Sequence, residues 1–223
     1  MMLVYGIGIL FALLFLASII AQLYVDYVFH RWSRVSNRKN LTGEQVVERL
    51  STSEQLGTQL TFTPKKLGDH YDPNTNTVCL SLDVASNPSV AALAISAHEL
   101  GHAQQKKTDS GLMRLREVLV PAVRISPLVI YGLVATGLFL RFTSAFWLAG
   151  AAFGITMLFM LLTLPVEFDA SRRAMVMLER NQLITPEDRK GAQQMLTAAG
   201  LTYVVASVFS VAQFLRFIVL ARR

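Results

Sequence analysis

The sequence predicts a mainly α-helical integral membrane protein with about four transmembrane helices and a small α+β region in the cytoplasm. The first supporting observation is composition: 52% of the 223 residues are hydrophobic, and the mean hydropathy is +0.42. Soluble domains are only about 45–50% apolar, even with glycine counted. The second observation is the gathering of apolar residues into four blocks, each near the length of about 20 residues that a spanning helix needs. The blocks are residues 2–23, 118–140, 144–164 and 201–220.

The four blocks differ in how purely apolar they are. Residues 2–23 and 144–164 are uncharged, whereas the second block contains Arg124 and the fourth contains Gln213 and Arg216. The first block has no basic segment before it and no small-residue cleavage pattern after it, which favours an uncleaved anchor over a signal peptide. The fourth block is expected to be either a transmembrane helix or a re-entrant helix.

The distribution of charge predicts the orientation in the membrane. The formal net charge is +6, with 21 Lys and Arg residues against 15 Asp and Glu. By the positive-inside rule, the basic segments between blocks are cytoplasmic and the N-terminus is outside. The basic residues are dispersed and lack regularly interleaved aromatic residues, so contact with lipid headgroups explains them and no nucleic-acid partner is expected. Arg141 is the only basic residue in the turn between blocks two and three. If the fourth block spans the membrane, the tail residues Arg222 and Arg223 lie outside, which departs from the rule.

The chain is therefore expected to have five consecutive segments. Its single cysteine, Cys79, excludes an internal disulfide framework. The segments are transmembrane helix 1 at residues 1–24, a cytoplasmic region at 25–117, a transmembrane hairpin of helices 2 and 3 at 118–165, cytoplasmic helices at 166–200, and a transmembrane or re-entrant helix at 201–223.

Local patterns predict helices and a small sheet in the cytoplasmic region. Thr42 and Gln45 form a capping-box pattern at a helix start. Ser86 or Asn87 can begin the next helix. The strand at residues 78–82 could pair an extended peptide if it is an exposed edge, although an ordinary core hairpin is slightly favoured. The elements expected are a helix over residues 41–50, a strand over 60–63, and a hairpin of 68–71 with 77–82 around the turn signal at 72–76.

Two helices are expected in residues 166–200. The first continues the third apolar block out of the membrane. The second begins at Thr185, with Pro186 at its first helical position, and Gly200 is expected to separate it from the fourth block.

The motif His98-Glu99-Leu100-Gly101-His102 predicts a catalytic zinc site on a helix. Residues four apart lie on one helix face, so His98 and His102 can ligate one metal ion. Glu99 is rotated by about 100° from His98 and can act on a water molecule instead of the metal. This arrangement is typical of zinc hydrolases, in which the glutamate serves as general base. The alternative is a buried amphipathic helix with two structural histidines.

Glu167 is the expected third metal ligand. Catalytic zinc sites use three protein ligands and leave one position open. His102 lies shortly before the second apolar block and Glu167 directly after the third. Because two consecutive spans return the chain to the same membrane face, both residues are expected near one another. The alternative is an interfacial glutamate that pairs with Arg172 or Arg173.

Three further residues are candidates for supporting roles. Asp169 points about 200° away from Glu167 on a helix, so it is expected to support a ligating histidine from behind unless it is simply a solvated partner of the following arginines. His70 and Tyr71 are candidates for contact with the substrate or with the oxyanion of a tetrahedral intermediate. A polar loop histidine with a local hydrogen bond is an equal alternative for His70.

The chain resembles the YugP-like neutral zinc metallopeptidases of bacterial membranes. The resemblance runs from about residue 41 to the fourth block and rests on three motifs: His98-Glu99-Leu100-Gly101-His102, Gly68-Asp69-His70-Tyr71-Asp72-Pro73, and residues 164–171 around Glu167. The chain is more distantly similar to the HtpX and CAAX prenyl proteases, whose third ligand begins a Glu-x-x-x-Asp pattern. Here Ser171 stands at the position of that aspartate.

This resemblance implies a multi-pass protein of the bacterial inner (plasma) membrane with a zincin-like cytoplasmic region that binds Zn²⁺. The expected activity is endoproteolysis of membrane or misfolded proteins at the cytoplasmic face, with the lipid bilayer and a protein or peptide substrate as partners. The alternatives are a zinc-binding membrane scaffold with little proteolysis and a metal-dependent hydrolase of a non-peptide, lipid substrate. A homo-oligomer or a membrane-protein partner stays open.

Overall fold

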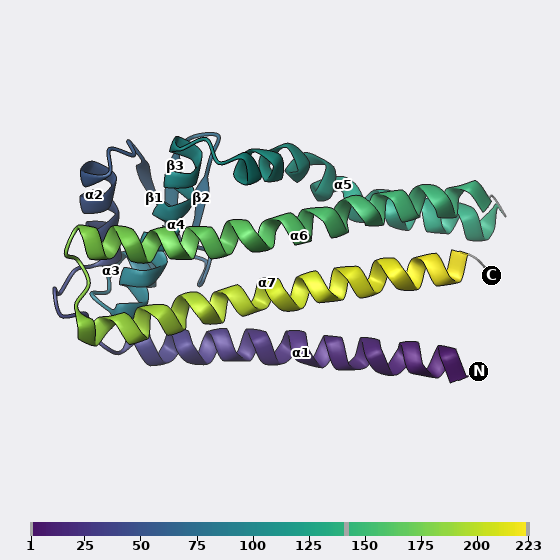
Figure 1. Ribbon diagram of the computed structural model, residues 1–223, viewed down its shortest axis with the longest axis horizontal. Coiled ribbons are helices and arrows are strands. Elements are labelled where there is room, and N and C mark those ends of the chain that lie inside the picture. The colour runs from purple at the N-terminus through teal and green to yellow at the C-terminus, as the bar shows by residue number, and fades with distance from the viewer. Residues whose placement is uncertain (1, 141–142, 222–223) are drawn as a thin grey trace. The chain divides into compact units, whose positions relative to one another are not determined.

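The computed structural model describes residues 2–140 and 143–221 (Figure 1). Arg141, Arg222 and Arg223, which entered the charge argument, lie outside the described residues. The elements in chain order are α1 (Met2–Ser33), α2 (Gly43–Ser53), β1 (Gln59–Thr63), β2 (His70–Asp72), β3 (Thr77–Ser81), α3 (Leu82–Ser86), α4 (Val90–Lys107), α5 (Gly111–Phe139), α6 (Thr143–Arg180) and α7 (Pro186–Ala221).

The chain divides into two compact units, which are described separately. We call the first the apolar unit; it comprises Met1–Ala21, Arg114–Pro165 and Thr202–Arg223. We call the second the sheet unit; it comprises Gln22–Met113 and Val166–Leu201. Helices α1, α6 and α7 each contribute residues to both units.

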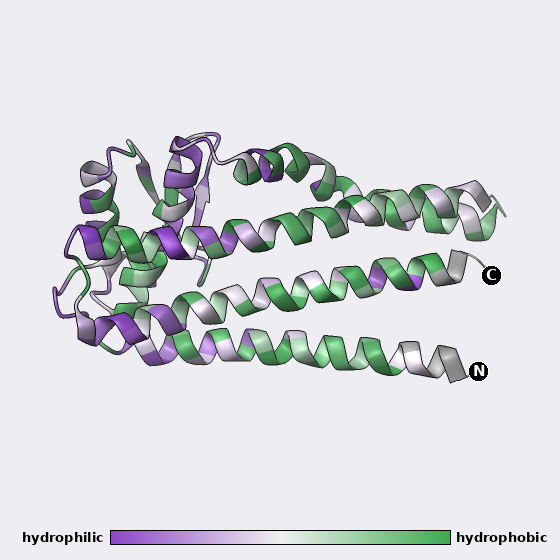
Figure 2. Cartoon of the chain, in the orientation of Figure 1, coloured by the Kyte–Doolittle hydropathy of each residue, from purple (hydrophilic) through white to green (hydrophobic). Residues whose placement is uncertain are grey.

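Four helices are long and apolar enough to cross a membrane, as the sequence predicts. Figure 2 shows hydrophobic residues along most of their length. Large apolar side chains such as Leu128 (80% exposed) and Trp147 (60% exposed) face outward in the apolar unit, as expected for surfaces covered by lipid. The candidate spans are Gly8–Ser33, Gly111–Phe139, Ser144–Arg180 and Pro186–Ile218.

The prediction of a break at Gly200 is wrong, because α7 runs without interruption from Pro186 to Ala221. A glycine inside a helix costs only about 1 kcal/mol relative to alanine, which packing can offset. Here the Phe168 ring occupies the space beside Gly200, where a Cβ would lie 3.1 Å from Phe168 Cε1. The fourth block is therefore the second half of one long helix.

The sheet unit contains a three-stranded sheet in the order β1-β3-β2. The predicted hairpin is confirmed: β2 pairs antiparallel with β3, with Tyr71 opposite Val78. Strand β1 pairs parallel with β3 on the other side, with Phe62 opposite Leu80. The suggestion that residues 78–82 form an exposed edge is wrong, because β3 is the central strand and β1 and β2 are the edges.

Helices α2 and α4 of the sheet unit each begin directly after a residue whose side chain caps the helix. The predicted capping box is confirmed, since Thr42 and Gln45 exchange hydrogen bonds at the start of α2. The start of α4 differs from the prediction: Ser89, and neither Ser86 nor Asn87, caps it by accepting from the Ala92 amide. The reason is that residues 82–86 form the separate short helix α3.

The core of the sheet unit is formed by residues of α2, the sheet, α4 and the end of α6. Its fully buried members come from every one of these elements, so the motif helix is held on several sides. The largest fully buried side chains include Leu50, Leu80, Leu93, Leu100, Met177 and Leu178.

Candidate metal centre

Helix α4 carries the motif residues, and one side of this helix is buried in the core. Leu93, Ala97 and Leu100 are completely buried in the core, which leaves the opposite side of the helix for polar groups. His98 is half-buried, while Glu99 and His102 are only 8% and 6% exposed. A helix anchored in this way holds its polar side chains with little freedom, as a metal site requires.

Helix α6 passes very close to α4 at Gly101, the fourth residue of the motif. A Cβ at this position would lie 2.4 Å from the carbonyl oxygen of Ala170. Ala170 is itself completely buried. The small residues therefore allow the two backbones to approach, and this approach brings Glu167, one turn before Ala170, beside the histidines.

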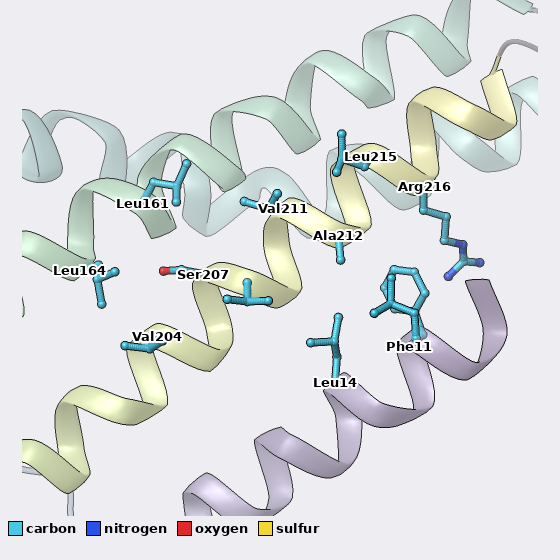
Figure 3. A pocket seen from close by; sticks show the side chains of 12 residues that line it. Phe11, Leu14, Leu161, Leu164, Val204, Ser207, Val211, Ala212, Leu215 and Arg216 are labelled. Carbon is cyan, nitrogen blue, oxygen red and sulfur yellow. The ribbon is translucent and has the colours of Figure 1, made fainter. Parts of the chain in front are cut away.

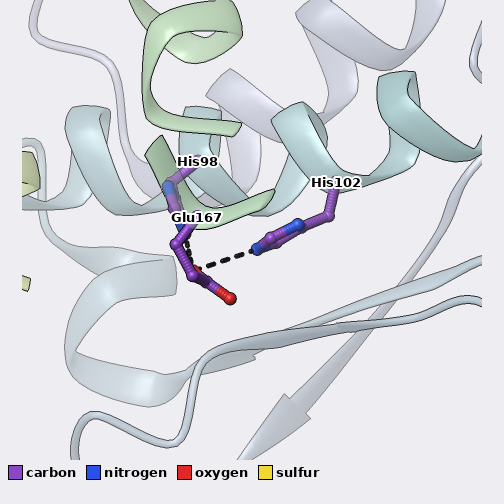
Figure 4. Close-up of side chains that lie close together, drawn as sticks. All are labelled: His98, His102 and Glu167. Atoms are coloured by element: carbon purple, nitrogen blue, oxygen red, sulfur yellow. Dashed lines mark hydrogen bonds and ion pairs between the residues drawn. The ribbon is translucent and has the colours of Figure 1, made fainter. Parts of the chain in front are cut away.

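His98, His102 and Glu167 converge on one point (Figure 4). Glu167 Oε2 lies 3.2 Å from His98 Nε2 and 3.5 Å from His102 Nε2. One ligand atom from each of the three residues lies within 4.8 Å of the others. Ligands about 2.0–2.2 Å from a tetrahedral zinc ion are about 3.3–3.6 Å apart. The spacing and the donor types, two imidazoles and a carboxylate, therefore fit zinc.

Glu167 is set up as an anion although it is only 3% exposed. Burial acts to raise the pKa of its carboxyl group, but hydrogen bonds from His102 and His98 outweigh burial and hold that pKa well below its ordinary value. An ionised carboxylate between two imidazoles has the charge that a divalent cation needs for compensation.

Glu99 has the opposite electrostatic environment. Burial raises the pKa of its carboxyl group to about 7, and the negative charges of Glu167 and Asp69 add to this effect while His98 opposes it. A bound divalent cation would shift this pKa downward. A glutamate whose pKa lies near neutrality can both accept and release a proton.

His102 is oriented from behind by Gln105. The side-chain amide of Gln105 donates to the Val166 carbonyl at 2.8 Å and to Asp169 Oδ2 at 2.9 Å. With both amide hydrogens used, Gln105 Oε1 is left to accept from His102 Nδ1, 3.0 Å away. When Nε2 ligates a metal ion, the ring proton of His102 therefore lies on Nδ1 and is donated to Gln105 Oε1.

Asp169 contacts Gln105, whereas the sequence predicted that it supports a ligating histidine directly. Its carboxylate accepts from Gln105 and pairs with Arg172 and Arg173. Burial acts to raise its pKa, but these hydrogen bonds lower the pKa to about 2. Asp169 thus supports Gln105, and Gln105 contacts the histidine. Gln105 was missed in the sequence, although its position three residues after His102 put it on the same helix face.

Ser171 supports the other histidine. Its hydroxyl lies 3.2 Å from His98 Nδ1, and when Nε2 ligates a metal Nδ1 carries the ring proton and donates to this oxygen. Ser171 follows Glu167 by one turn and shares its helix face. The serine therefore makes the hydrogen bond behind His98 that the sequence had left in doubt.

His70 and Tyr71 lie on the edge strand β2 but point to opposite faces, as neighbours in a strand do. His70 is exposed, its Nδ1 lies 2.8 Å from the Gly68 carbonyl oxygen, and its charge acts on Glu99. Tyr71 is only 8% exposed and donates its hydroxyl to Asn76 Oδ1 at 2.8 Å. The structure thus places His70 in the electrostatic surroundings of the motif and Tyr71 in the core.

Comparison with known proteins agrees with this geometry. A family model described as "Putative neutral zinc metallopeptidase" matches residues 7–222. The Bacillus subtilis (strain 168) protein described as "Putative membrane protease YugP" is 33% identical over 206 residues, which cover 90% of this chain and 89% of that protein. No solved structure matches the chain significantly. Together with the four apolar helices, the likeness makes the chain a multi-pass membrane protein. The chain belongs to the family of putative neutral zinc metallopeptidases.

Proposed function

We propose that the protein is a zincin-like membrane endopeptidase whose zinc ion is held by His98, His102 and Glu167. The observation that supports this proposal best is the convergence of the two motif imidazoles on one buried carboxylate, at 3.2 and 3.5 Å. Glu99, buried beside His98 and not part of this ligand set, is what a hydrolase needs and a purely structural zinc site does not.

The chemistry divides between the metal and Glu99. Bound zinc would lower the pKa of water and polarise the scissile carbonyl group. The Glu99 carboxylate accepts a proton from the water molecule as its oxygen attacks the carbonyl carbon. Glu99 then gives the proton to the leaving amine as the carbon–nitrogen bond breaks. The products are two shorter peptides, and no covalent bond to the protein forms.

The sheet offers a place for the peptide substrate. Among the described residues, strand β2 pairs with β3 alone, so its other edge has backbone groups that an extended peptide can pair with. Helix α4 packs against β2. His70 is the exposed side chain on this strand, and we assign it to contact the substrate or the developing oxyanion.

We assign the active site to the cytoplasmic side of the inner membrane. The support is the positive-inside rule, applied to basic residues of the sheet unit such as Arg31, Arg34 and Arg180. The substrates are then cytoplasmic loops or tails of membrane proteins, or misfolded segments.

The first test compares the wild-type protein with Glu99→Gln in proteoliposomes. The variant should bind one zinc ion with unchanged affinity and cleave an unfolded protein substrate about 10²–10⁴-fold more slowly, because the proton acceptor is lost. Glu167→Ala should lose zinc affinity as well as activity. Glu179→Gln, which removes an α6 carboxylate paired with Arg189 outside the centre, is the matched control and should change neither.

The outcomes separate the alternatives. Undiminished cleavage by Glu99→Gln would contradict the mechanism, and full zinc affinity in Glu167→Ala would contradict the ligand set. Zinc binding without peptide cleavage by the wild type would indicate a scaffold. Glu99-dependent release of fatty acid from the vesicles would indicate a lipid hydrolase.

A further inference from the structure

The apolar unit contains a groove that has no part in the metal centre (Figure 3). Its volume is about 550 Å³. Helices α1, α6 and α7 line it with leucine, valine, alanine and phenylalanine side chains, and Arg216 is the one charged residue among the described lining residues. Ser207, the one hydroxyl among the same residues, donates to the Met160 carbonyl at 3.1 Å. The wall is therefore apolar in character, and Arg216 supplies its one site for an anion.

Within the part of the chain that the structure describes, Arg216 has no acidic partner on the helices that line the groove. Neither aspartate nor glutamate occurs in the sequence of residues 1–21, 143–165 and 202–223. The one acidic residue in the sequence of the whole apolar unit is Glu117 on α5. The Arg216 guanidinium lies 5.0 Å from the centre of the Phe11 ring, a cation–π contact that orients the group without neutralising it. An unneutralised cation in a membrane-spanning helix marks a place for an anionic ligand.

The position of Arg216 along α7 suits a lipid phosphate. It lies four residues before Leu220, the end of the fourth apolar block of the sequence, which is about 6 Å along the helix axis. An arginine one or two turns from the end of a span extends its guanidinium to the headgroup level while its stem stays in the apolar layer. The groove runs from this end of the helix toward Val204 and Leu164 (Figure 3).

The size of the groove distinguishes between apolar occupants. One turn of a helix about 10 Å wide and 5.4 Å long fills about 400 Å³, so the groove would hold little more than one turn of the roughly 20 residues in a spanning helix. A substrate or partner helix would therefore leave most of its length outside the groove. A single flexible acyl chain is narrow enough to lie along it.

We propose that this groove binds one anionic phospholipid, with an acyl chain along α1, α6 and α7 and the phosphodiester on Arg216. The guanidinium can donate two parallel hydrogen bonds to the phosphate oxygens. A zwitterionic lipid with the same chains fills the groove equally well, but its positive headgroup lies next to Arg216 and weakens the attraction. The site therefore selects by headgroup charge.

Native mass spectrometry of the full-length protein tests the proposal. The protein is exchanged from detergent into nanodiscs that contain equal amounts of phosphatidylglycerol and phosphatidylcholine with identical chains. One phosphatidylglycerol should be retained in preference to phosphatidylcholine by about tenfold or more, the value of a charge-assisted hydrogen bond. Arg216→Gln should abolish the preference, and Arg216→Lys should retain most of it.

Two further variants distinguish lipid binding in the groove from general electrostatic attraction between the protein and anionic lipid. Arg124→Gln removes an exposed arginine of α5 that does not line the groove and should leave the preference unchanged. Ala212→Trp fills the groove and should remove the retained lipid altogether. Equal retention of both lipids by the wild type, no retained lipid, or a preference that survives Arg216→Gln would overturn the proposal. Zinc stoichiometry, measured in parallel, verifies that each variant is folded and keeps this test independent of proteolysis.

Discussion

At the scale of single residues, the metal centre depends on the groups that stand behind the ligands. Ser171 and Gln105 contact the Nδ1 atoms of His98 and His102 at 3.2 and 3.0 Å. Both partners are neutral, unlike the carboxylate that often supports a ligating histidine. Neutral partners orient the rings without making them more basic. In the proposed zinc centre they would therefore leave more of the metal's positive charge for the substrate.

Removal of the Ser171 hydroxyl should weaken metal binding. Ser171→Ala leaves His98 Nδ1 without its acceptor, and loss of such a partner costs about 10–100-fold in metal affinity. Ser171→Thr keeps the hydroxyl and should stay within a few-fold of wild type. Zinc affinity is measured by competition with a chromophoric chelator. Ser53→Ala, which removes an exposed helical hydroxyl from α2, is the control, and equal losses in both alanine variants would argue against a specific role.

At the scale of elements, the site exists because two helices touch through their backbones. Gly101 lies inside the motif and faces the Ala170 carbonyl of α6. The amide of Gln105 donates to the Val166 carbonyl across the same interface. The separation of α4 from α6 thus sets the distance between the histidines and Glu167.

Gly101→Ala should damage the centre although it alters no ligand. The added Cβ would meet the Ala170 oxygen at 2.4 Å, so α6 must move away and take Glu167 with it. Overpacking of this kind costs about 1–3 kcal/mol of stability, and zinc affinity should fall with it. Thermal unfolding and chelator competition measure the two effects. Gly111→Ala, where no atom lies within 4 Å of the new Cβ, is the matched control and should be neutral in both assays.

At the scale of the whole molecule, polar contacts hold distant segments of the sheet unit together. Glu54, at the end of α2, accepts hydrogen bonds from Arg180 and Asn181, which lie 126 and 127 residues later in the chain. Lys107, at the end of α4, donates to the Glu54 carbonyl at 2.9 Å. Three helix ends therefore meet at one residue, Glu54, through its carboxylate and its backbone carbonyl.

The contribution of Glu54 to stability should depend on pH. Burial acts to raise its pKa, but the hydrogen bonds from Arg180 and Asn181 and the Arg180 charge outweigh burial, so the pKa lies below its ordinary value of 4.5. A carboxyl group with a lowered pKa stabilises the fold above its unfolded-state pKa and loses this effect as pH falls through the folded-state pKa. The stabilisation should therefore be complete at pH 7, begin to decline near the ordinary pKa of about 4.5, and disappear as the pH falls through the lower folded-state pKa.

A double-mutant cycle with Glu54→Gln and Arg180→Gln measures this dependence. Thermal unfolding of the solubilised protein between pH 7 and pH 3 should show a coupling that shrinks with acidification. High salt should weaken it because Arg180 is largely solvent-exposed. A coupling that is constant over this range would show that the pair is not ionic.

The sequence by itself determined the features that depend on neighbouring residues. The four apolar blocks, the capping box at Thr42 and the hairpin around residues 72–76 are all local patterns, and the structure contains each of them. The spacing of His98 and His102 placed both on one helix face. Glu167 was proposed from chain topology alone, and the structure brings it to both histidines.

Only the tertiary structure decided which distant residues meet. Strand β1 pairs in parallel with β3 and makes β3 central, because long-range pairing leaves no local pattern in the sequence. The continuity of α7 through Gly200 depends on the Phe168 ring beside it. The contact of Ser171 with His98 likewise arises where α4 and α6 cross. Val166 and Asp169 of α6 orient Gln105 there. A sequence specifies the side chains available to such a crossing, whereas the packing of the two helices decides their distances.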